Sequence, residues 1–282
     1  MGDQRVVVVT GASSGIGAVV AASLAEQGDH VVAVGRDIRR TEDVARRIGG
    51  EPYVADFARL DEVRELAETL SVNHPTIDVL LSNAGGLVSR RGTTVDGHDL
   101  SFQVNQLAPY LLMRLLTPSL RAAATQNGVA TVVATASAAN RWGRIRLDDL
   151  EGRRRPWLGG WRAYGTAKLA VVLTARELAR REGDHGIGSF SVHPGAVVTS
   201  FGSGSALIRL GTALTGGRWG TTPDAGAAPL FALASGGPVP APNGTYFDGL
   251  RAGGRTAGQA DDAALAAELW RRSAEMTGLP AQ

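Results

Sequence analysis

Short apolar runs rich in β-branched residues recur along the first 200 residues of the 282-residue chain, and helical spacing of apolar positions follows most of them. The runs predict strands at residues 5–10, 30–34, 52–55, 77–81, 129–135 and 187–192. The stretches between them predict helices at residues 15–28, 39–49, 60–73, 98–125 and 161–182. Near the end of the chain, a further strand is predicted at 244–247 and a last helix at 261–277.

Strands that alternate with helices are typical of βαβ units, which join parallel strands through right-handed crossovers. Runs such as Val6–Val9 are apolar at every position rather than at alternate ones, as expected when helices cover both faces of a sheet. We therefore predict the α/β class, with a doubly wound parallel sheet of the Rossmann type.

No Pro-, Gly- or Ser-rich linker interrupts this pattern, so residues 1–282 are predicted to form a single domain. Within it, residues 200–222 combine frequent glycines with Leu207, Ile208 and Leu210. This mixture predicts a short helix on glycine hinges, which would act as a small substrate lid. A poorly ordered surface loop is the alternative.

The composition excludes several function classes. The chain has no cysteine, so it has no disulfide framework, cysteine–metal cluster or thiol nucleophile, and we predict no metal ligands. The valines at Val6–Val9 are too few for the apolar region of a signal peptide, and no stretch reaches the ~18 apolar residues of a membrane helix. We expect a cytoplasmic protein without a membrane partner.

The formal charge is +2, although the sequence pI is about 9.4. Of the 29 lysines and arginines, only Lys168 is a lysine, and since arginine stays charged to high pH, a small positive excess raises the pI. The pI is therefore poor support for a nucleic-acid partner, and we expect none. A single lysine among arginines indicates a position that needs a compact ammonium, although chance could also have left one.

The first predicted strand leads into Thr10–Gly17, in which three glycines form a GxxxGxG pattern before an alanine-rich helix. Glycines at a strand–helix junction let the backbone approach a pyrophosphate, and the helix N-terminus offers free N–H groups. We predict a dinucleotide phosphate loop with contacts from Gly11, Ser13, Ser14, Gly15, Ile16 and Gly17. A tight turn without a ligand is the alternative.

The segment Gly11–Gly15 also satisfies the GxSxG pattern of α/β-hydrolases, which would make Ser13 a nucleophile with His193 as its base. A nucleophile elbow on the first strand would be unusual, and Gly17 fits this interpretation less naturally. A serine hydrolase is therefore kept as an alternative of low weight.

Tyr164 and Lys168 lie four residues apart at the start of a predicted helix and so share one face. A free phenol rarely ionises at neutral pH, but a nearby ammonium favours the phenolate and lowers the pKa. A tyrosine in this position can exchange a proton with a substrate oxygen while a hydride moves at the adjacent carbon. The pair therefore predicts an oxidoreductase.

Together these features resemble the short-chain dehydrogenase/reductase superfamily over nearly the whole chain, and most closely its retinol-dehydrogenase-like branch. The superfamily resemblance is carried by Thr10–Gly17, Asp56-Phe57, Asn83-Ala84-Gly85, Asn105, Ser137, Tyr164–Lys168, Pro194-Gly195 and Thr199. The resemblance to the branch is carried by Lys168-Leu169-Ala170, Arg176–Ala179, His193-Pro194-Gly195, Gly244–Phe247, Leu269-Trp270 and Gly278-Leu279.

The resemblance implies that Tyr164 is the general acid in reduction and the base in oxidation, with Lys168 bonded to the nicotinamide ribose. It also implies that Ser137 donates a hydrogen bond to the substrate oxygen and that Asn105 holds a water linking Lys168 to solvent. Asp56 would bind the adenine. The other cofactor contacts that it implies are Phe57, Asn83, Ala84, Gly85, Pro194, Gly195, Val197 and Thr199.

Several of these residues also have structural interpretations. Ser137 could be an ordinary serine at a strand end, since Ala136 stands where the family usually has a second serine. Asn83 could brace a turn, and His193 could be structural. The arginines at 153–155, in the loop before Tyr164, fit a solvated surface loop better than a site for an anionic substrate.

The end of the second predicted strand bears on the choice of cofactor. Gly35 stands where an NAD-type acid would bind the ribose 2′-hydroxyl, and Arg36 beside it suits a 2′-phosphate, with help from Arg39 or Arg40. Asp37 comes one residue late for the role of the acid. We therefore predict NADP(H) rather than NAD(H).

The predicted function is hydride transfer between NADP(H) and a carbonyl or alcohol of a hydrophobic small molecule. The composition is similar to that of a high-GC bacterium, in which such enzymes often reduce ketones of secondary metabolites. A non-redox or regulatory NAD(P)-binding protein on the same fold is the alternative. Relatives pair through the helices predicted at 98–125 and 161–182, so we expect a homodimer or homotetramer.

Overall fold

The computed structural model describes residues 4–195, 222–237 and 239–280 of the chain. Apart from Thr222, the lid predicted at 200–222 lies outside the described residues, as do Val197 and Thr199. No helix in the described part of the chain combines the length and the apolar character needed to cross a membrane.

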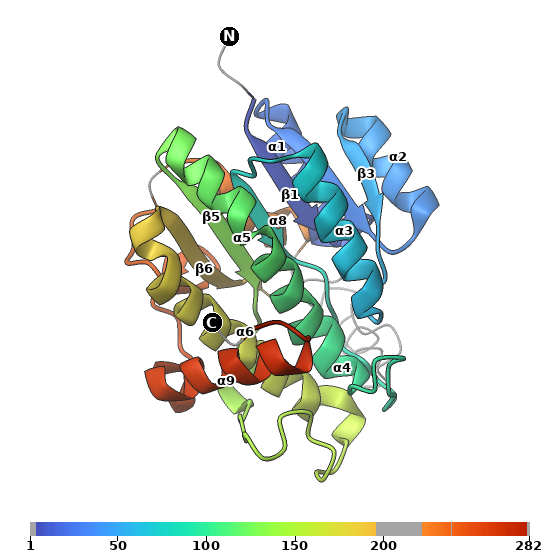
Figure 1. Cartoon of the computed structure of the whole chain (residues 1–282), viewed down its shortest axis with the longest axis vertical. Coiled ribbons are helices and arrows are strands. Elements are labelled where there is room, and N and C mark those ends of the chain that lie inside the picture. Colours follow the sequence, from blue (N-terminus) through green and yellow to red (C-terminus); the bar gives the residue numbers. More distant parts are fainter. Residues whose placement is uncertain (1–3, 196–221, 238, 281–282) are drawn as a thin grey trace.

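Eight strands of the described residues form one sheet in the order β3-β2-β1-β4-β5-β6-β7-β8 (Figure 1). All neighbouring pairs are parallel except β7 and β8, which are antiparallel. The strands are β1 (Val6–Thr10), β2 (His30–Gly35), β3 (Glu51–Val54), β4 (Val79–Ser82), β5 (Ala130–Thr135), β6 (Ile187–His193), β7 (Tyr246–Asp248) and β8 (Arg251–Ala252). The order grows outward from β1 in one direction and from β4 in the other, so the predicted doubly wound fold is confirmed.

Helices pack on both faces of the sheet (Figure 1). One face carries α1 (Gly15–Glu26), α2 (Ile38–Ile48) and α8 (Pro223–Ala234), and the other carries α3 (Leu60–Asn73), α5 (Ala108–Asn127) and α6 (Trp161–Glu182). The short α4 (Leu100–Phe102) and α9 (Ala263–Met276) pack against α6.

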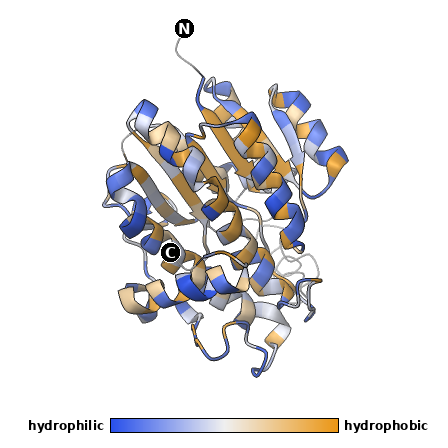
Figure 2. Ribbon diagram, viewed as in Figure 1, coloured by the Kyte–Doolittle hydropathy of each residue, from blue (hydrophilic) through white to orange (hydrophobic). Residues whose placement is uncertain are grey.

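Successive residues of β1 enter different cores, which explains why this strand is apolar throughout. Val7 and Val9 pack in the core beneath α1 and α8, with Leu24 and Leu230. Val8 packs in the core beneath α3 and α5. In Figure 2 the central strands are hydrophobic, whereas the helices turn hydrophilic residues outward. Burial of both faces is the physical basis of the unbroken apolar runs.

The structure differs from the predicted elements in three places. The helix predicted at 98–125 is interrupted, because α4 is followed by a π-helical turn at Gln103–Leu107 before α5 begins. Apolar spacing near 3.6 residues does not reveal such a local change of pitch. The helix α8 was not predicted, since glycine, proline and alanine dominate its sequence, and the two-residue strand β8 is too short to show a pattern.

Candidate active site

The carboxyl ends of β1, β4 and β5 bring three predicted site segments to one edge of the sheet. Thr10 ends β1, Ser82 ends β4 and Thr135 ends β5, and the three strands are neighbours. The strand order reverses between β1 and β4, and open α/β sheets bind ligands in the crevice beyond such a point. The glycine loop, the segment from Asn83 and Ser137 all follow these strand ends.

The glycine loop has the backbone that a pyrophosphate cradle needs. Gly11 and Gly15 have φ angles of +70° and +59°, in the left-handed region that glycine adopts without steric cost. A Cβ atom on Gly17 would lie 2.2 Å from the carbonyl oxygen of Gly11, so the loop closes tightly on α1. Ser14, at the N-cap of α1, makes no side-chain cap bond, and Ile16 packs against the core. The first N–H groups of α1 are thus left for another acceptor, as a dinucleotide phosphate would provide.

Asn83 ties this loop to the neighbouring strands. Its Nδ2 atom donates to the carbonyl oxygen of Thr10 at 3.1 Å, and its Oδ1 atom accepts from the Thr135 hydroxyl at 3.2 Å. The Thr10 hydroxyl in turn accepts from the backbone N–H groups of Asn83 and Ala84, at 2.9 and 3.0 Å. These bonds support the bracing role of Asn83, while its contact with a cofactor stays a prediction.

The end of β2 has no room for an acidic side chain at the predicted ribose position. A Cβ atom on Gly35 would lie 2.2 Å from Thr41 Oγ1 and 2.9 Å from Ser13 Cβ. Asp37 caps α2 by accepting a hydrogen bond from the Arg40 N–H at 3.1 Å. The Arg36 side chain is exposed at this edge. Asp37, the acid nearest to the predicted ribose position, is therefore used to cap α2.

Asp56 and Phe57 follow β3, at the end of the crevice where adenine is expected. Asp56 is half-buried, and its Oδ1 atom accepts from the Ala58 N–H at 3.0 Å. The Phe57 side chain packs into the core with Leu60 and Val63 of α3. The ring of Phe57 thus belongs to the core, which leaves its backbone for the predicted cofactor contact.

Tyr164 lies in the first turn of α6 and is buried, with 4% of its surface exposed. Its hydroxyl and the side chain of Ser137 form a hydrogen bond, and the Trp161 ring meets the Tyr164 ring edge-on at 6.3 Å. Burial raises the pKa of Tyr164 well above its ordinary value, and the bond with Ser137 opposes this only in part. Burial therefore favours the neutral, protonated form of the Tyr164 phenol.

Lys168 lies one turn further along α6 and is also buried. Its Nζ atom donates to the carbonyl oxygen of Thr135 at 2.7 Å and lies 5.7 Å from the centre of the Tyr164 ring. Burial lowers the pKa of Lys168 to about 8. Burial is the largest influence on the ionisation of both groups, and a lowering of the pKa of Tyr164 by Lys168 stays a prediction.

Asn105 occupies the π-helical turn between α4 and α5 and is buried. Its Oδ1 atom accepts from the Gly86 N–H at 2.9 Å, and its Nδ2 atom donates to the carbonyl oxygens of Gly86 and Ser101, both at 2.9 Å. A Cβ atom on Gly85 would lie 2.6 Å from Asn105 Oδ1 and 3.6 Å from Lys168 Nζ. Asn105 therefore holds the segment after β4 against Lys168, and the water predicted at Asn105 stays a prediction.

The segment after β6 brings Pro194 and Gly195 to the same edge of the sheet, and Gly195 has a φ angle of +95°. His193 ends β6, and burial lowers its pKa. Strands β4 and β5 separate β6, which His193 ends, from β1, which precedes Ser13. Ser13 lies on the other side of β1, where a Cβ atom on Gly35 at the end of β2 would be 2.9 Å from its own Cβ atom. The described residues therefore give no support to a pairing of Ser13 with His193.

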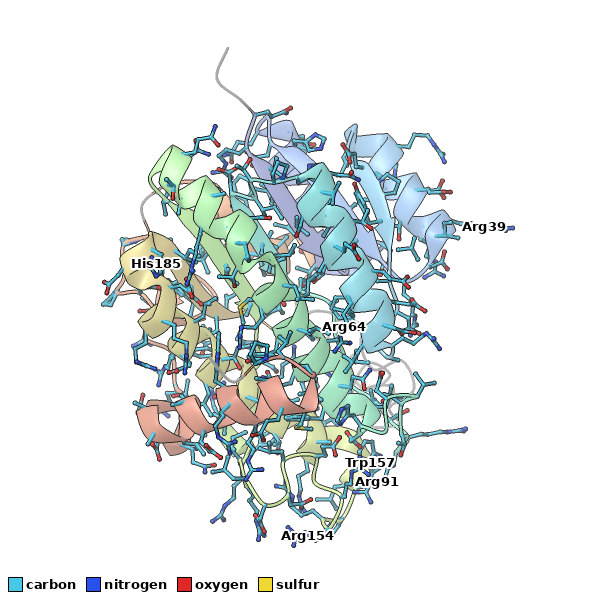
Figure 3. The ribbon with its side chains drawn as sticks, in the orientation of Figure 1. Arg39, Arg64, Arg91, Arg154, Trp157 and His185 are labelled. Carbon is cyan, nitrogen blue, oxygen red and sulfur yellow. The ribbon has the colours of Figure 1, made fainter. Side chains whose placement is uncertain are left out.

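The arginines at 153–155 pair with acidic residues of their own loop. Arg154 and Asp148 lie 2.8 Å apart, and Arg155 and Asp149 lie 3.2 Å apart. Figure 3 shows Arg154 at the tip of this loop, pointing away from the sheet. Because the guanidinium groups have carboxylate partners, the solvated-loop interpretation fits them better than a site for an anionic substrate.

The profile of the short chain dehydrogenases matches residues 5–148. A protein of Streptomyces sp. (strain C5) named "Putative daunorubicin C-13 ketoreductase DnrU" is 41% identical over 285 residues, covering 97% of this chain and 93% of that protein. The chain belongs to the short-chain dehydrogenase family. Human retinol dehydrogenase 13 is 32% identical over 291 residues, covering 98% of this chain and 86% of the human protein, which confirms the resemblance to the retinol-dehydrogenase-like branch.

Solved structures agree with this family. A crystal structure of a Mycobacterium paratuberculosis protein matches with a TM-score of 0.78 at 33% identity, covering 99% of this chain and 95% of that chain. A 3-ketoacyl-(acyl-carrier-protein) reductase of Brucella melitensis in complex with NADH has a TM-score of 0.65 at 25% identity, with coverages of 89% and 98%. The RhlG/NADP complex of Pseudomonas aeruginosa has a TM-score of 0.68 at 26% identity, with coverages of 86% and 94%. Short-chain dehydrogenases thus use nicotinamide dinucleotides of both kinds.

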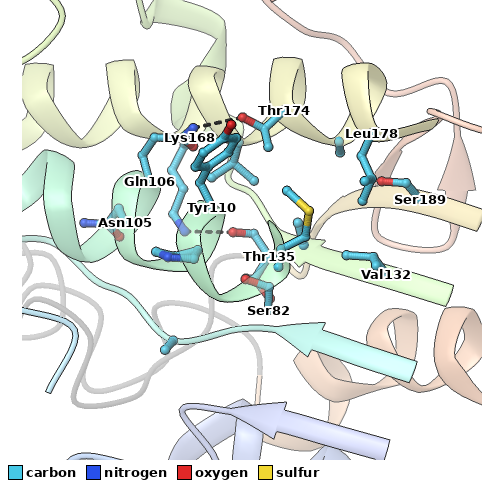
Figure 4. Close-up of a pocket in the computed structure, with 16 residues that line it drawn as sticks. Ser82, Asn105, Gln106, Tyr110, Val132, Thr135, Lys168, Thr174, Leu178 and Ser189 are labelled. Atoms are coloured by element: carbon cyan, nitrogen blue, oxygen red, sulfur yellow. Dashed lines mark hydrogen bonds between the residues drawn. The ribbon is translucent and has the colours of Figure 1, made fainter. Parts of the chain in front are cut away.

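A narrow cavity lies beside Lys168 in this short-chain dehydrogenase, between α5, α6 and strands β4 to β6 (Figure 4). Asn105, Gln106, Thr135 and Thr174 line it, and Gln106 donates to Thr174 across it at 2.8 Å. The cavity offers about 30 Å³, more than the roughly 10–15 Å³ that one water molecule needs. Space for a water therefore adjoins the ammonium group.

Sequence reasoning missed the main-chain partners of Lys168 and Asn105. The carbonyl oxygen of Thr135 binds Lys168, and the backbone of Gly86 binds Asn105. These contacts use main-chain atoms, which any residue type supplies, so residue identity carries no signal for them. Only the position of Thr135, at the carboxyl end of β5 and two residues before Ser137, points to this edge of the sheet.

Proposed function

We propose that this short-chain dehydrogenase is an NADP(H)-dependent reductase of hydrophobic ketones, with Tyr164 as its general acid. The observation that carries the proposal is the convergence of three groups beside the crevice, of which Tyr164 and Lys168 are buried and Ser137 is half-buried. Ser137 and Tyr164 share a hydrogen bond, and Lys168 is fixed to the end of β5 one helical turn away. A phenol, a hydroxyl and an ammonium in this order suit proton delivery to a substrate oxygen.

Each side chain has a defined part in the reaction. When bound in the crevice, the dinucleotide would supply a hydride for the carbonyl carbon. Tyr164 would give its hydroxyl proton to the carbonyl oxygen, so that the ketone becomes an alcohol. Ser137 donates a hydrogen bond to the same oxygen while negative charge builds there. Lys168 would hold the nicotinamide ribose and pass a proton toward Tyr164, and the adjoining cavity has room for a water that would restore that proton from solvent.

The preference for NADP(H) is supported by the end of β2. An acid that binds the ribose 2′-hydroxyl is the usual mark of NAD selectivity, and the packing of Gly35 on Thr41 leaves no space for one. Asp37 is used as the cap of α2. Arg36 directly follows Gly35, and its exposed guanidinium group carries the positive charge and the hydrogen-bond donors that suit a 2′-phosphate.

The relative named as a daunorubicin ketoreductase supports a polycyclic or otherwise lipophilic ketone from bacterial secondary metabolism as the substrate class. The test is a titration of the purified protein with NADPH and with NADH, followed by tryptophan fluorescence, and then NADPH oxidation with a panel of aromatic ketones. We expect tighter binding of NADPH than of NADH and turnover with at least one lipophilic ketone. Binding without turnover would favour a regulatory protein, and no binding of either dinucleotide would reject the proposal.

A further inference from the structure

His30, Glu51 and His74 gather at the amino end of the sheet, away from the crevice. His30 begins β2 in register with the first residue of β1, Glu51 begins β3, and His74 follows the last residue of α3. His30 Nε2 lies 3.0 Å from Glu51 Oε1, and His74 Nε2 lies 3.2 Å from Glu51 Oε2. One carboxylate thus lies between two imidazoles that present the same ring nitrogen.

The fold places all three side chains on the face that α3 covers. Residues two apart along a strand share a face, so His30 lies on the same side as Val32, which packs beneath α3. Glu51 is the register partner of Val32 on β3. His74 closes the end of α3 above them. The convergence follows from the register of two strands and the length of one helix.

Neighbouring side chains orient the carboxylate. The Tyr53 hydroxyl donates to Glu51 Oε2 at 3.2 Å, and Asn73 Nδ2 donates to the Tyr53 oxygen at 3.0 Å. Metal-binding carboxylates and imidazoles are commonly held by such outer hydrogen bonds. The His74 side chain is 8% exposed, whereas those of His30 and Glu51 are 27% and 44% exposed. One side of the cluster is therefore fixed, and the other side is open to water.

We propose that His30, Glu51 and His74 bind a Zn²⁺ ion, with water as the fourth ligand, independently of the proposed reductase activity. Their ligand atoms all lie within 4.8 Å of one another. Tetrahedral Zn²⁺ with bonds of about 2.0–2.1 Å has ligand atoms roughly 3.3 Å apart, close to the two imidazole–carboxylate separations. The two separations run to different oxygens of Glu51, so one oxygen meets both imidazole nitrogens at the ion once the partly exposed Glu51 carboxylate and His30 ring rotate.

The two imidazole nitrogens and the carboxylate oxygen favour Zn²⁺ over other common metal ions. Two imidazoles and one carboxylate suit Zn²⁺, whereas Mg²⁺ and Ca²⁺ prefer oxygen ligands. A bound ion would join β2, the edge strand β3 and the end of α3 in place of the shared hydrogen bonds. We infer a stabilising ion at the amino end of the sheet. Glu51 lies 21 residues after His30 and 23 residues before His74, so the three ligands do not form a local sequence motif.

The experiment uses the tag-free full chain and Co²⁺ as a spectroscopic probe. We expect one Co²⁺ per chain with a visible absorption band of a four-coordinate nitrogen–oxygen site, which stoichiometric Zn²⁺ abolishes. Zn²⁺ should also raise the melting temperature. His74→Gln and Glu51→Gln should each weaken Zn²⁺ binding at least ~10-fold, since loss of even an outer-shell partner has effects of this size. The matched control is His185→Gln, because His185 is exposed on the far side of the molecule in η4 (Gly183–His185) and should leave the affinity unchanged (Figure 3).

The Glu51→Gln and His185→Gln variants together distinguish a specific Zn²⁺ site from nonspecific metal binding. Loss of the band in Glu51→Gln together with its retention in His185→Gln supports the site, even if the buried His74→Gln variant fails to fold. Equal Zn²⁺ affinity in the parent chain and in Glu51→Gln would reject it, as would a cobalt spectrum of the fully hydrated ion. NADPH binding of each variant, measured in the same samples, should not change, which keeps this test apart from that of the reductase.

Discussion

Around β1 the crevice is built from backbone, whereas beside β5 it is built from side chains. The loop at Gly11–Gly17 offers N–H groups and close contacts that leave no space for a Cβ atom on Gly17. Beside β5, the half-buried hydroxyl of Ser137 is bonded to the buried phenol of Tyr164, and the buried ammonium of Lys168 is bonded to the strand end. The first region is suited to holding a phosphate, and the second to moving a proton.

This difference predicts different consequences of substitution. In the backbone-built region, added atoms displace the loop, so that binding of the cofactor is lost. In the region built from side chains, loss of one polar atom can leave the shape intact and remove a step of the reaction. Four measurements follow, from the largest expected effect to the smallest.

Tyr164→Phe should lower kcat for ketone reduction on the order of 10³-fold, about 4 kcal/mol, because it removes the proton donor. The ring stays in place against Trp161, so the dissociation constant of NADPH should change little. Steady-state kinetics and a fluorescence titration of the same sample check both parts. Tyr53→Phe is the control, since Tyr53 lies in β3 and its hydroxyl bonds to Glu51 at 3.2 Å instead. Full turnover by Tyr164→Phe would remove Tyr164 from the mechanism.

Gly17→Ala should raise the dissociation constant of NADPH at least ~100-fold, because the new Cβ atom meets the carbonyl oxygen of Gly11 at 2.2 Å and pushes the loop off the helix terminus. Gly258→Ala is the matched control, because a Cβ atom on Gly258 meets nothing within 4 Å. Both variants are titrated with NADPH after their fold is checked by circular dichroism. Normal NADPH binding by a folded Gly17→Ala protein would show that the loop does not hold the cofactor.

Lys168→Met should remove a pH dependence of stability that burial creates. The pKa of Lys168 is about 8 in the folded protein and near 10.4 in an unfolded chain, so between these values the unfolded chain binds more protons. The free energy of unfolding should therefore rise with pH, by about 1.5 kcal/mol between roughly pH 8 and 9.5. Tyr164, with its raised pKa, opposes this only above about pH 10.

Urea unfolding of the parent chain and of Lys168→Met at the two pH values measures this difference directly. Since the other titrating groups are common to both proteins, subtraction of the two pH dependences isolates Lys168. An identical slope in both proteins would mean that the ammonium reaches solvent and that its pKa is not lowered. Such a result would also weaken the contrast between the backbone-built and the side-chain-built region.

Local patterns predicted much of this architecture. The glycine loop and the Tyr164–Lys168 pair each lie within eight consecutive residues, and one strand–helix junction or one helical turn defines their geometry. The parallel strands were predicted because burial on both faces makes every residue of Val6–Val9 apolar. Where a site is formed by residues that are close together in the chain, it can be recognised from the residue types in the sequence.

Contacts across the fold could not be predicted from such patterns. The bond between Ser137 and Tyr164 requires β5 and α6 to be placed together, and it was not predicted; the resemblance implied only a bond from Ser137 to the substrate oxygen. The π-helical turn that aims Asn105 at Gly86 depends on the packing of α4 and α5. The cluster at His30, Glu51 and His74 needs the register of β2 and β3. In all three cases tertiary packing, rather than local spacing, decides which side chains meet.

Arg36→Ala should have the smallest effect of the four substitutions. It tests whether, within the region built from backbone, one exposed side chain decides between NADPH and NADH. Loss of a charge-assisted contact to a 2′-phosphate at an exposed site should weaken NADPH binding about 10-fold, or about 1.4 kcal/mol, and leave NADH binding unchanged. Arg46→Ala is the control, because Arg46 lies in the last turn of α2 and pairs with Asp43 at 3.1 Å. A preference for NADPH that is unchanged in Arg36→Ala would move the phosphate contact to Arg39 or Arg40. An equal loss of NADPH and NADH affinity would instead show that Arg36 supports the loop after β2 rather than the 2′-phosphate.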